Sequence, residues 1–252
     1  MVDRETRRLS FGSVAADYDR YRPPPPPQAL DWLIPPDATA ILDLAAGTGV
    51  VTRELVGRAA RVFAVEPDER MRAVLAARCP GAEVLDGRGE DIPLPDASVN
   101  AVVISAAWHW LDPERAVPEI TRVLRVGGTL GVLWTSRDDR VPWLAEFNAL
   151  ARESREADRP REGSPRRRHR EVKFPPGTPL SSPEERRVKF SLPMTSEQLA
   201  GLLGTYSGVI TLDPERRADF SRRVRTFLDR RPWDEVDVPM ICRCLRSTRL
   251  PG

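Results

Sequence analysis

Short apolar runs alternate with helical patterns through the first half of the chain. Five runs have the length of strands, at residues 40–44, 61–65, 82–85, 99–104 and 127–134. Apolar residues at helical spacing follow the first two runs and also cover residues 113–124. Because the runs do not alternate apolar with polar residues, we expect strands that are buried on both faces. Their alternation with helices indicates βαβ units and a parallel sheet.

The pattern returns near the C-terminus. We expect a strand at residues 184–191, helices at 196–204 and 213–229, and a last strand at 236–246. Asp213 followed by Pro214 is a favourable start for the second of these helices. In the last strand Met240, Cys242 and Cys244 share one face, since side chains alternate along a strand. The two cysteines are therefore predicted to be packed thiols and not a redox pair.

The N-terminal segment is polar with scattered aromatic residues. A short helix there would carry Ala15, Tyr18 and Arg22 on one side. The five prolines at residues 23–27 predict an extended, stiff spacer after it.

Residues 151–183 interrupt the alternation of strands and helices. This segment is rich in Arg, Glu, Pro and Ser, and it contains an arginine-rich cluster at residues 166–170. We interpret it as a flexible loop, because acidic residues are interspersed and no aromatic residues accompany the arginines. A patch for nucleic acid or an acidic partner is the alternative.

Composition narrows the class of protein. With 252 residues and 40% hydrophobic side chains, the chain can bury a sizeable core, and we expect a single domain. The 39 basic and 37 acidic residues leave a net charge of +2, which argues against a nucleic-acid partner. All basic residues but Lys173 and Lys189 are arginine, which together with 25 prolines we attribute mainly to coding bias.

Cysteine and histidine usage indicates a reducing compartment and no metal site. The three cysteines form no CxxC pair and no even framework, which fits the cytoplasm. Two histidines are too few for a histidine-rich metal site. No apolar run approaches the roughly 20 residues of a membrane span, and no secretory signal follows Met1. We therefore expect a cytoplasmic protein without a membrane partner.

The segment with the most chemical information runs from Asp43 to Gly49, between the first strand and a helix. Its glycine-rich turn would let a ligand approach the backbone closely. Glu66 ends the second strand, 19 residues after Gly47, where a carboxylate can accept both hydroxyls of a ribose. After the third strand, Asp91 can accept from an adenine amine and Ile92 can pack on the ring. Ligands of open α/β sheets bind at this carboxyl edge.

These residues resemble the class I S-adenosylmethionine-dependent methyltransferases, in the group that includes the ubiquinone/menaquinone-type and trans-aconitate-type enzymes. The family's acidic residue and alternate glycines are matched by Asp43, Gly47 and Gly49, while Ala45 replaces the first glycine. Glu66 matches the ribose-binding acid. Residues 119–128 are similar to the family's helix-to-strand turn, and residues 11–27 to its N-terminal lid.

The resemblance implies an α/β fold, a Rossmann-like three-layer sandwich with a seven-stranded, mostly parallel sheet whose last strand is antiparallel. It divides one domain, 1–252, into an N-terminal lid at 1–27, a cofactor-binding core at 36–150, the loop at 151–183, and late strands at 184–252 with a helical insertion at 192–235. It also implies S-adenosyl-L-methionine as cofactor and S-adenosyl-L-homocysteine as product. The cofactor-binding residues implied are Tyr21, Asp43, Ala45, Gly47, Thr48, Gly49, Glu66, Pro67, Met71, Glu90, Asp91, Ile92, Ser105 and Ala106.

For the acceptor side we expect a small molecule, with His109, Tyr18 and Arg22 as catalytic residues. His109 follows the fourth strand and could deprotonate or orient the acceptor, or it could simply pack between Trp108 and Trp110. Arg22 could clamp an acceptor carboxylate, or pair with a surface acid. Tyr206 and the stretch at 134–143 are further candidates for the pocket lining.

Three other functions stay open. A nicotinamide-dependent oxidoreductase would want a glycine where Thr52 stands. A nucleic-acid methyltransferase acting on exocyclic amines would carry an Asn/Asp-Pro-Pro-aromatic tetrad, but residues 105–108 read Ser-Ala-Ala-Trp. A non-methylating binding protein or cyclase on the same fold is the third. We expect the protein to be a monomer or a homodimer.

Overall fold

The computed structural model describes residues 10–156, 171–231 and 233–251. This part of the chain forms two compact units. The first, which we call the helical unit, consists of residues 10–22, 136–156 and 189–241. The second, the sheet unit, consists of residues 23–135, 171–188 and 242–251. The assignment of residues 1–252 to one domain stays a prediction.

Seven strands form one sheet in the order β3-β2-β1-β4-β5-β7-β6. Adjacent strands among the first five are parallel. Next to them, Gly127 and Gly128 of β5 exchange backbone hydrogen bonds with Arg249 in the antiparallel sense. The predicted fold, a mostly parallel seven-stranded sheet with antiparallel late strands, is confirmed. The strands are β1 (Ala40–Leu44), β2 (Arg61–Val65), β3 (Glu83–Leu85), β4 (Val99–Ser105), β5 (Leu124–Arg137), β6 (Glu184–Thr195) and β7 (Glu235–Thr248).

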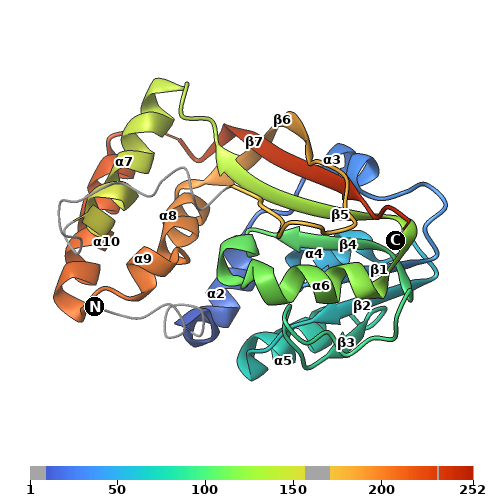
Figure 1. Ribbon diagram of the computed structural model, residues 1–252. Helices are drawn as coiled ribbons and strands as arrows, with labels where there is room; N and C mark the ends of the chain where they lie inside the picture. The colour runs from blue at the N-terminus through green and yellow to red at the C-terminus, as the bar shows by residue number, and fades with distance from the viewer. Residues whose placement is uncertain (1–9, 157–170, 232, 252) are drawn as a thin grey trace. The chain divides into compact units, whose positions relative to one another are not determined.

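Helices cover both faces of the parallel strands. On one face Leu42 and Leu44 of β1 share a core with Val117 and Ile120 of α6. On the other, Ala64 of β2 packs against α5. The sheet unit is therefore a three-layer sandwich, and Figure 1 shows α6 lying across the strands. Its helices are α3 (Pro27–Leu33), α4 (Val50–Leu55), α5 (Glu69–Arg78) and α6 (Pro113–Val123), with a 3₁₀ turn η2 (Trp108–Trp110).

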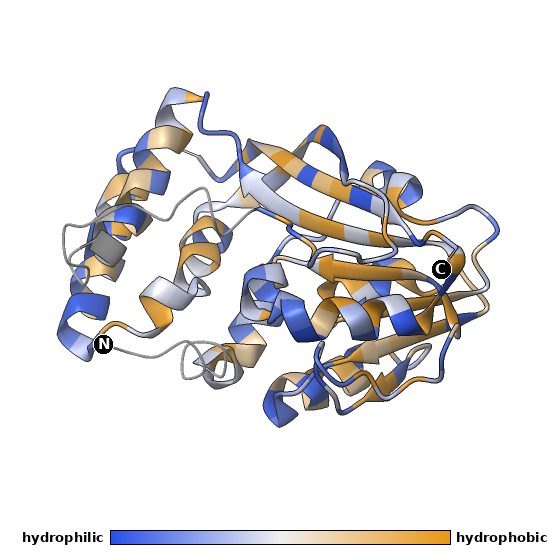
Figure 2. Ribbon diagram, viewed as in Figure 1, coloured by the Kyte–Doolittle hydropathy of each residue, from blue (hydrophilic) through white to orange (hydrophobic). Residues whose placement is uncertain are grey.

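The central strands β1 and β4 are largely apolar and buried, as expected where a sheet is covered on both sides. All five residues of β1 are buried, and the central strands are the most hydrophobic ribbons in Figure 2. Helices start where the sequence places polar caps: Asp68 accepts from two amides of α5, and Asp112 caps α6 ahead of Pro113. The strand ends and the loops beyond them are thereby fixed.

The helical unit has its own apolar core. It contains η1 (Ser10–Val14), α2 (Ala15–Tyr21), α7 (Pro142–Glu156), α8 (Ser196–Gly204), α9 (Ser207–Ile210) and α10 (Pro214–Asp229). Phe147 of α7 is fully buried among leucines of α8 and the apolar stripe of α10, which includes Phe220 and Val224. Asp213 caps α10 as predicted, by accepting from the amide of Arg216.

Some predictions needed correction. Pro27 is not part of the extended spacer but the first residue of α3, and neither α3, α7 nor α9 was predicted. Residues 151–156, which we assigned to a flexible loop, are the last turns of α7. At the other end of that loop, Val172 and Phe174 pack against the core of the sheet unit. The arginine-rich cluster at 166–170 lies outside the described residues.

The cysteines are buried, and none of the three forms a disulfide. The Cys242 and Cys244 sulfurs lie 3.6 Å apart on one face of β7, so the predicted packing on one face is confirmed. Across the described ranges, no helix is both long and apolar enough to cross a membrane.

Candidate functional site

The turn between β1 and α4 holds three residues in the left-handed backbone region. The φ angle is 58° at Ala45, 60° at Gly47 and 87° at Gly49. Glycine adopts this conformation freely, whereas it costs an alanine about 1–2 kcal/mol. Ala45 therefore departs from the glycine pattern at a strained position. A Cβ at Gly49 would lie 2.6 Å from Leu75 Cδ1 and Cys79 Sγ, so packing against α5 also demands glycine there.

Glu66 joins this turn to the end of β2. Its Oε2 accepts from the Gly47 amide and its Oε1 from the Asp68 amide, each at 2.9 Å. The residue is 7% exposed. Carboxylates accept about four hydrogen bonds, so these contacts are compatible with accepting also from ribose hydroxyls. The predicted ribose-binding acid thus lies directly against the predicted glycine turn.

Asp43 lies beneath the turn and is held by α4. Its Oδ2 accepts from the Thr52 hydroxyl at 2.7 Å. Burial raises the pKa of Asp43 to about 7; the Thr52 hydrogen bond opposes this shift and the charge of Glu66 adds to it. The Asp43 side chain therefore links β1 to α4 and fixes the turn from below.

The side chain of Thr48 indicates whether the turn is suited to a polar ligand. It is fully buried, and its Oγ1 makes no hydrogen bond to any residue that the structure describes. An unsatisfied buried hydroxyl costs about 1–3 kcal/mol. A polar ligand that closes over the turn could supply the missing partner, so the residues present fit a cofactor of the implied kind.

The loop after β3 carries the predicted adenine contacts. Ile92 is buried, whereas the Asp91 side chain is exposed. The Glu90 Oε1 accepts from the Asp112 amide at 2.8 Å. Contacts of Glu90 and Asp91 with the cofactor stay predictions.

An ion pair from α6, which we did not predict, holds this loop in place. Arg122 donates to the carbonyls of Ile92 and Leu94, and it pairs with Glu119 at 2.7 Å. Glu119 in turn accepts from the Ile92 amide, and its pKa is lowered mainly by the Arg122 hydrogen bond. The sequence signal was present in the 119–128 segment, which we had interpreted only as a helix-to-strand turn.

The loop after β4 brings aromatic residues to the same edge. Ala106 has a φ of 53°, which turns the chain sharply after Ser105. Trp108 is buried against Phe174, with ring centroids 6.1 Å apart. The ring of His109 lies 4.5 Å from that of Trp110 and is tilted by 43°. His109 therefore packs against Trp110, and its part in catalysis stays a prediction.

Thirteen of the fourteen predicted cofactor residues belong to the sheet unit, in the elements and loops at the carboxyl ends of β1 to β4. Pro67 and Met71 complete the group at the start of α5, where the Met71 amide donates to Asp68. Tyr21 belongs to the helical unit.

Comparison with known proteins supports the same assignment. Residues 42–132 match the methyltransferase domain family. An uncharacterized methyltransferase of Mycobacterium tuberculosis (strain H37Rv) is 39% identical over 249 residues, which cover 97% of this chain and 98% of the relative. A second, from Schizosaccharomyces pombe, is 27% identical over 252 residues, covering 96% and 98%.

A solved structure of a candidate type II methyltransferase from Anaeromyxobacter dehalogenans agrees. It is 26% identical, with a TM-score of 0.65 over 92% of this chain and all of that one. The chain belongs to the class I S-adenosylmethionine-dependent methyltransferases.

In the helical unit, this methyltransferase assembles three of the predicted acceptor-side residues. The Arg22 guanidinium lies 4.8 Å from the Tyr18 ring and 4.7 Å from the Tyr206 ring. Its Nε and Nη2 donate to the hydroxyl and carbonyl of Thr205, both at 2.9 Å. Arg22 is thus held by neutral groups and pairs with no acid among the described residues, where a surface acid was the alternative considered.

Arg137, the last residue of β5, lies in the stretch at 134–143 that we named as a candidate for the pocket lining, although the sequence did not single it out. It is 6% exposed and lies over the rings of Phe147, at 5.3 Å, and Tyr206, at 5.6 Å. Its Nε donates to Asn148 Oδ1 at 2.6 Å. In a chain with 37 arginines, nothing in the sequence marked this one as buried.

Tyr21 is fixed by α8. Its hydroxyl donates to Glu197 Oε1 at 3.1 Å, and its ring lies so close to Gly201 that a Cβ there would be 2.5 Å away. Burial, followed by the hydrogen bond to Glu197, raises the pKa of Tyr21. Its contact with the cofactor stays a prediction.

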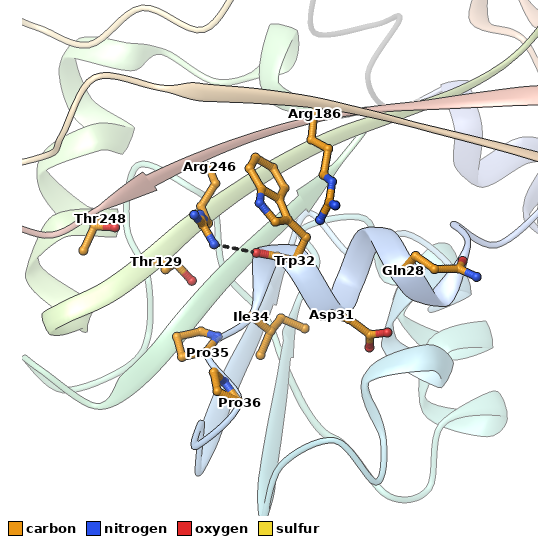
Figure 3. A pocket seen from close by; sticks show the side chains of 10 residues that line it. All are labelled: Gln28, Asp31, Trp32, Ile34, Pro35, Pro36, Thr129, Arg186, Arg246 and Thr248. Carbon is orange, nitrogen blue, oxygen red and sulfur yellow. Dashed lines mark hydrogen bonds between the residues drawn. The ribbon is translucent and has the colours of Figure 1, made fainter.

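A separate cavity of about 660 Å³ lies beside α3 in the sheet unit. Figure 3 shows the Trp32 indole between the guanidinium groups of Arg246 and Arg186. Arg246 donates to the Trp32 carbonyl and pairs with Glu184. Thr129, near the start of β5, also lines this cavity. The cavity therefore lies toward the amino end of β5 and is separate from the glycine turn.

Two tryptophans of the stretch at 134–143 make packing contacts, and its predicted place in the pocket lining stays a prediction. Trp134 is buried in β5, and Trp143 packs against Trp233 with ring centroids 4.7 Å apart.

Proposed function

We propose that this methyltransferase transfers the methyl group of S-adenosylmethionine to a small-molecule acceptor. In this reaction an acceptor lone pair forms a bond to the methyl carbon while the carbon–sulfur bond breaks, and its electrons return to sulfur to give S-adenosylhomocysteine. The enzyme contributes mainly by holding the two reactants in line and excluding water.

The observation that carries the proposal is the contact between Glu66 and the glycine turn. A buried carboxylate that already orders the Gly47 amide is positioned to bind the ribose hydroxyls. Asp91 would accept from the adenine amine, and Ile92 would pack on the ring. The buried hydroxyl of Thr48 would gain a partner from the cofactor.

A small-molecule acceptor is supported by the loop after β4 and by charge. Residues 105–108 lack the Asn/Asp-Pro-Pro-aromatic tetrad of enzymes that methylate base amines. The net charge of +2 gives no excess of positive charge for a polyanionic backbone.

The test uses the full chain with methyl-labelled S-adenosylmethionine and a panel of metabolites, read by mass spectrometry. We expect label on one or more small molecules and stoichiometric S-adenosylhomocysteine. Label confined to added DNA, RNA or protein would overturn the choice of acceptor class. Tight cofactor binding with no labelled product in any fraction would favour a non-methylating role.

A further inference from the structure

Arg137 carries a buried charge that no acid among the described residues neutralises. Its Nη1 is buried and has no hydrogen-bond partner, and no carboxylate within the described residues forms an ion pair with it. Arginine does not release its proton in proteins, so burial cannot neutralise it as it can a carboxyl group. An unpaired buried charge is strongly unfavourable unless something else compensates it.

The nearby acids are already engaged. Asp138 pairs with Arg140 at 2.5 Å. Asp139 accepts from the Asn148 amide nitrogen and from Arg152. Asn148 is thereby oriented with its oxygen toward Arg137. The surroundings therefore hold the guanidinium in position and leave its charge unmatched.

A second guanidinium belongs to the same cluster. Arg22 and Arg137 both lie over the Tyr206 ring, at 4.7 and 5.6 Å, within a column of Tyr18, Arg22, Tyr206, Arg137 and Phe147. We call these five residues the arginine column. The Thr205 hydroxyl donates its proton to the Leu202 carbonyl. Toward Arg22 Nε, this hydroxyl can therefore act only as an acceptor. Neither guanidinium forms an ion pair with an acid among the described residues, which is the arrangement that an anion site requires.

We propose that Arg22 and Arg137 bind a carboxylate of the methyl acceptor, an inference that rests on the proposed function. Arg22 uses its Nε and Nη2 on Thr205, whereas Arg137 uses its Nε on Asn148 and its buried Nη1 has no hydrogen-bond partner among the described residues. Guanidinium groups bind planar carboxylates and also phosphates through such N–H donors, so the test below includes both anions. Arg137 ends a strand of the parallel sheet, and ligands of such sheets bind at the carboxyl ends of strands.

A first experiment measures anion binding by thermal shift. The full chain is heated with succinate, benzoate, their neutral amides or inorganic phosphate, at equal ionic strength set with sodium chloride. We expect a carboxylate to raise the apparent Tm by about 3 °C or more, and the amides to have no effect. Stabilisation by phosphate alone, or by no carboxylate, would overturn the proposal.

The variant Arg137→Met removes the charge but keeps an apolar side chain against both rings. It should abolish the carboxylate shift without lowering the Tm measured in its absence, because the unmatched charge is gone. Arg222→Met removes an exposed arginine of α10 in the same unit and serves as the matched control. A Tm loss in Arg137→Met with the carboxylate shift retained would show a packing role instead.

A second experiment measures transfer to carboxylic acids and to their matched primary amides. We expect acids alone to be methylated, and Arg137→Met to lower kcat/KM at least 100-fold, mainly through KM. Arg137→Lys, which keeps the charge without the planar fork, covers the case in which the first variant misfolds and should lose about tenfold. Equal methylation of acids and amides would overturn the proposal.

Cofactor affinity separates failure of this inference from failure of the proposed function. S-adenosylhomocysteine should bind the Arg137 variants within twofold of the unsubstituted chain. If it binds and the acceptors prove neutral, only the carboxylate assignment fails. If it does not bind the unsubstituted chain, the proposed function fails as well.

Discussion

Each unit buries a charged side chain, Asp43 in the sheet unit and Arg137 in the helical unit, and the two differ in their partners and in whether they can lose their charge. Asp43 in the sheet unit has a hydroxyl donor from Thr52, and its pKa is raised to about 7, so it can also take up a proton. Among the described residues, Arg137 in the helical unit contacts Asn148 and two rings but no acid, and it cannot give up its charge. The fold itself supplies a partner for the first group, whereas we propose that an external anion supplies one for the second.

This difference separates a structural position from a binding position. The glycine turn is held by internal hydrogen bonds that involve Glu66 and Thr52. The arginine column is held by neutral contacts, with no acid among the described residues paired to either arginine. The first should therefore respond to pH and packing changes, and the second to added anions.

The largest effect should come from the titration of Asp43. Its folded pKa lies above its unfolded value, so the folded state holds a proton more tightly, and stability falls as pH rises from about 4 to about 7. The free energy of unfolding should fall by on the order of 4 kcal/mol at most over this range, because each unit of pKa shift corresponds to about 1.36 kcal/mol. Asp43→Asn keeps the Thr52 hydrogen bond and removes the titration.

The measurement is the difference in unfolding midpoint between the two proteins across this pH range. As the pH rises, we expect the unfolding midpoint of Asp43→Asn to increase relative to that of the unsubstituted chain. Parallel curves for the two proteins would mean that Asp43 is not the buried titrating group.

The next largest effect concerns packing at the turn. Gly49→Ala places a Cβ 2.6 Å from Leu75 and Cys79 at a positive φ, which should cost about 3 kcal/mol. Gly204→Ala, at the end of α8, meets nothing within 4 Å and should stay within about 0.5 kcal/mol. Thermal denaturation of both variants checks this. Equal losses would contradict the view that the turn is defined by packing against α5.

Cofactor affinity should distinguish the two regions directly. Glu66→Ala removes a carboxylate that orders the Gly47 amide, so S-adenosylhomocysteine binding should weaken at least tenfold, and by about 100-fold if both ribose bonds are lost. Glu83→Ala, an exposed acid on β3, is the control. Calorimetry gives both affinities, and an unchanged value for Glu66→Ala would remove the ribose assignment.

These two regions also differ in how far the sequence could reveal them. The turn and its partners Glu66 and Asp91 follow successive strands, so short motifs identified them together with the fold. The arginine column joins residues 18, 22, 137, 147 and 206, which only the tertiary structure brings together. The Arg122–Glu119 pair was missed, and Arg137 was not singled out within the stretch 134–143, because arginine is abundant here and its burial depends on distant neighbours. The start of α3 was missed because we assigned Pro27 to the extended spacer, and the end of α7 because we assigned residues 151–156 to a loop.

The smallest effect that we predict concerns His109, which combines a packing contact with a predicted role in binding the acceptor. Its ring stacks on Trp110, so part of its role is packing, yet it follows the strand that leads to the reacting edge. We expect His109→Ala to lower turnover about tenfold, with S-adenosylhomocysteine affinity nearly unchanged, because orienting an acceptor affects the transition state more than cofactor binding. His109→Gln keeps a polar side chain and should recover part of the loss. An unaltered rate in His109→Ala would assign the residue to packing, like Trp108 beside it.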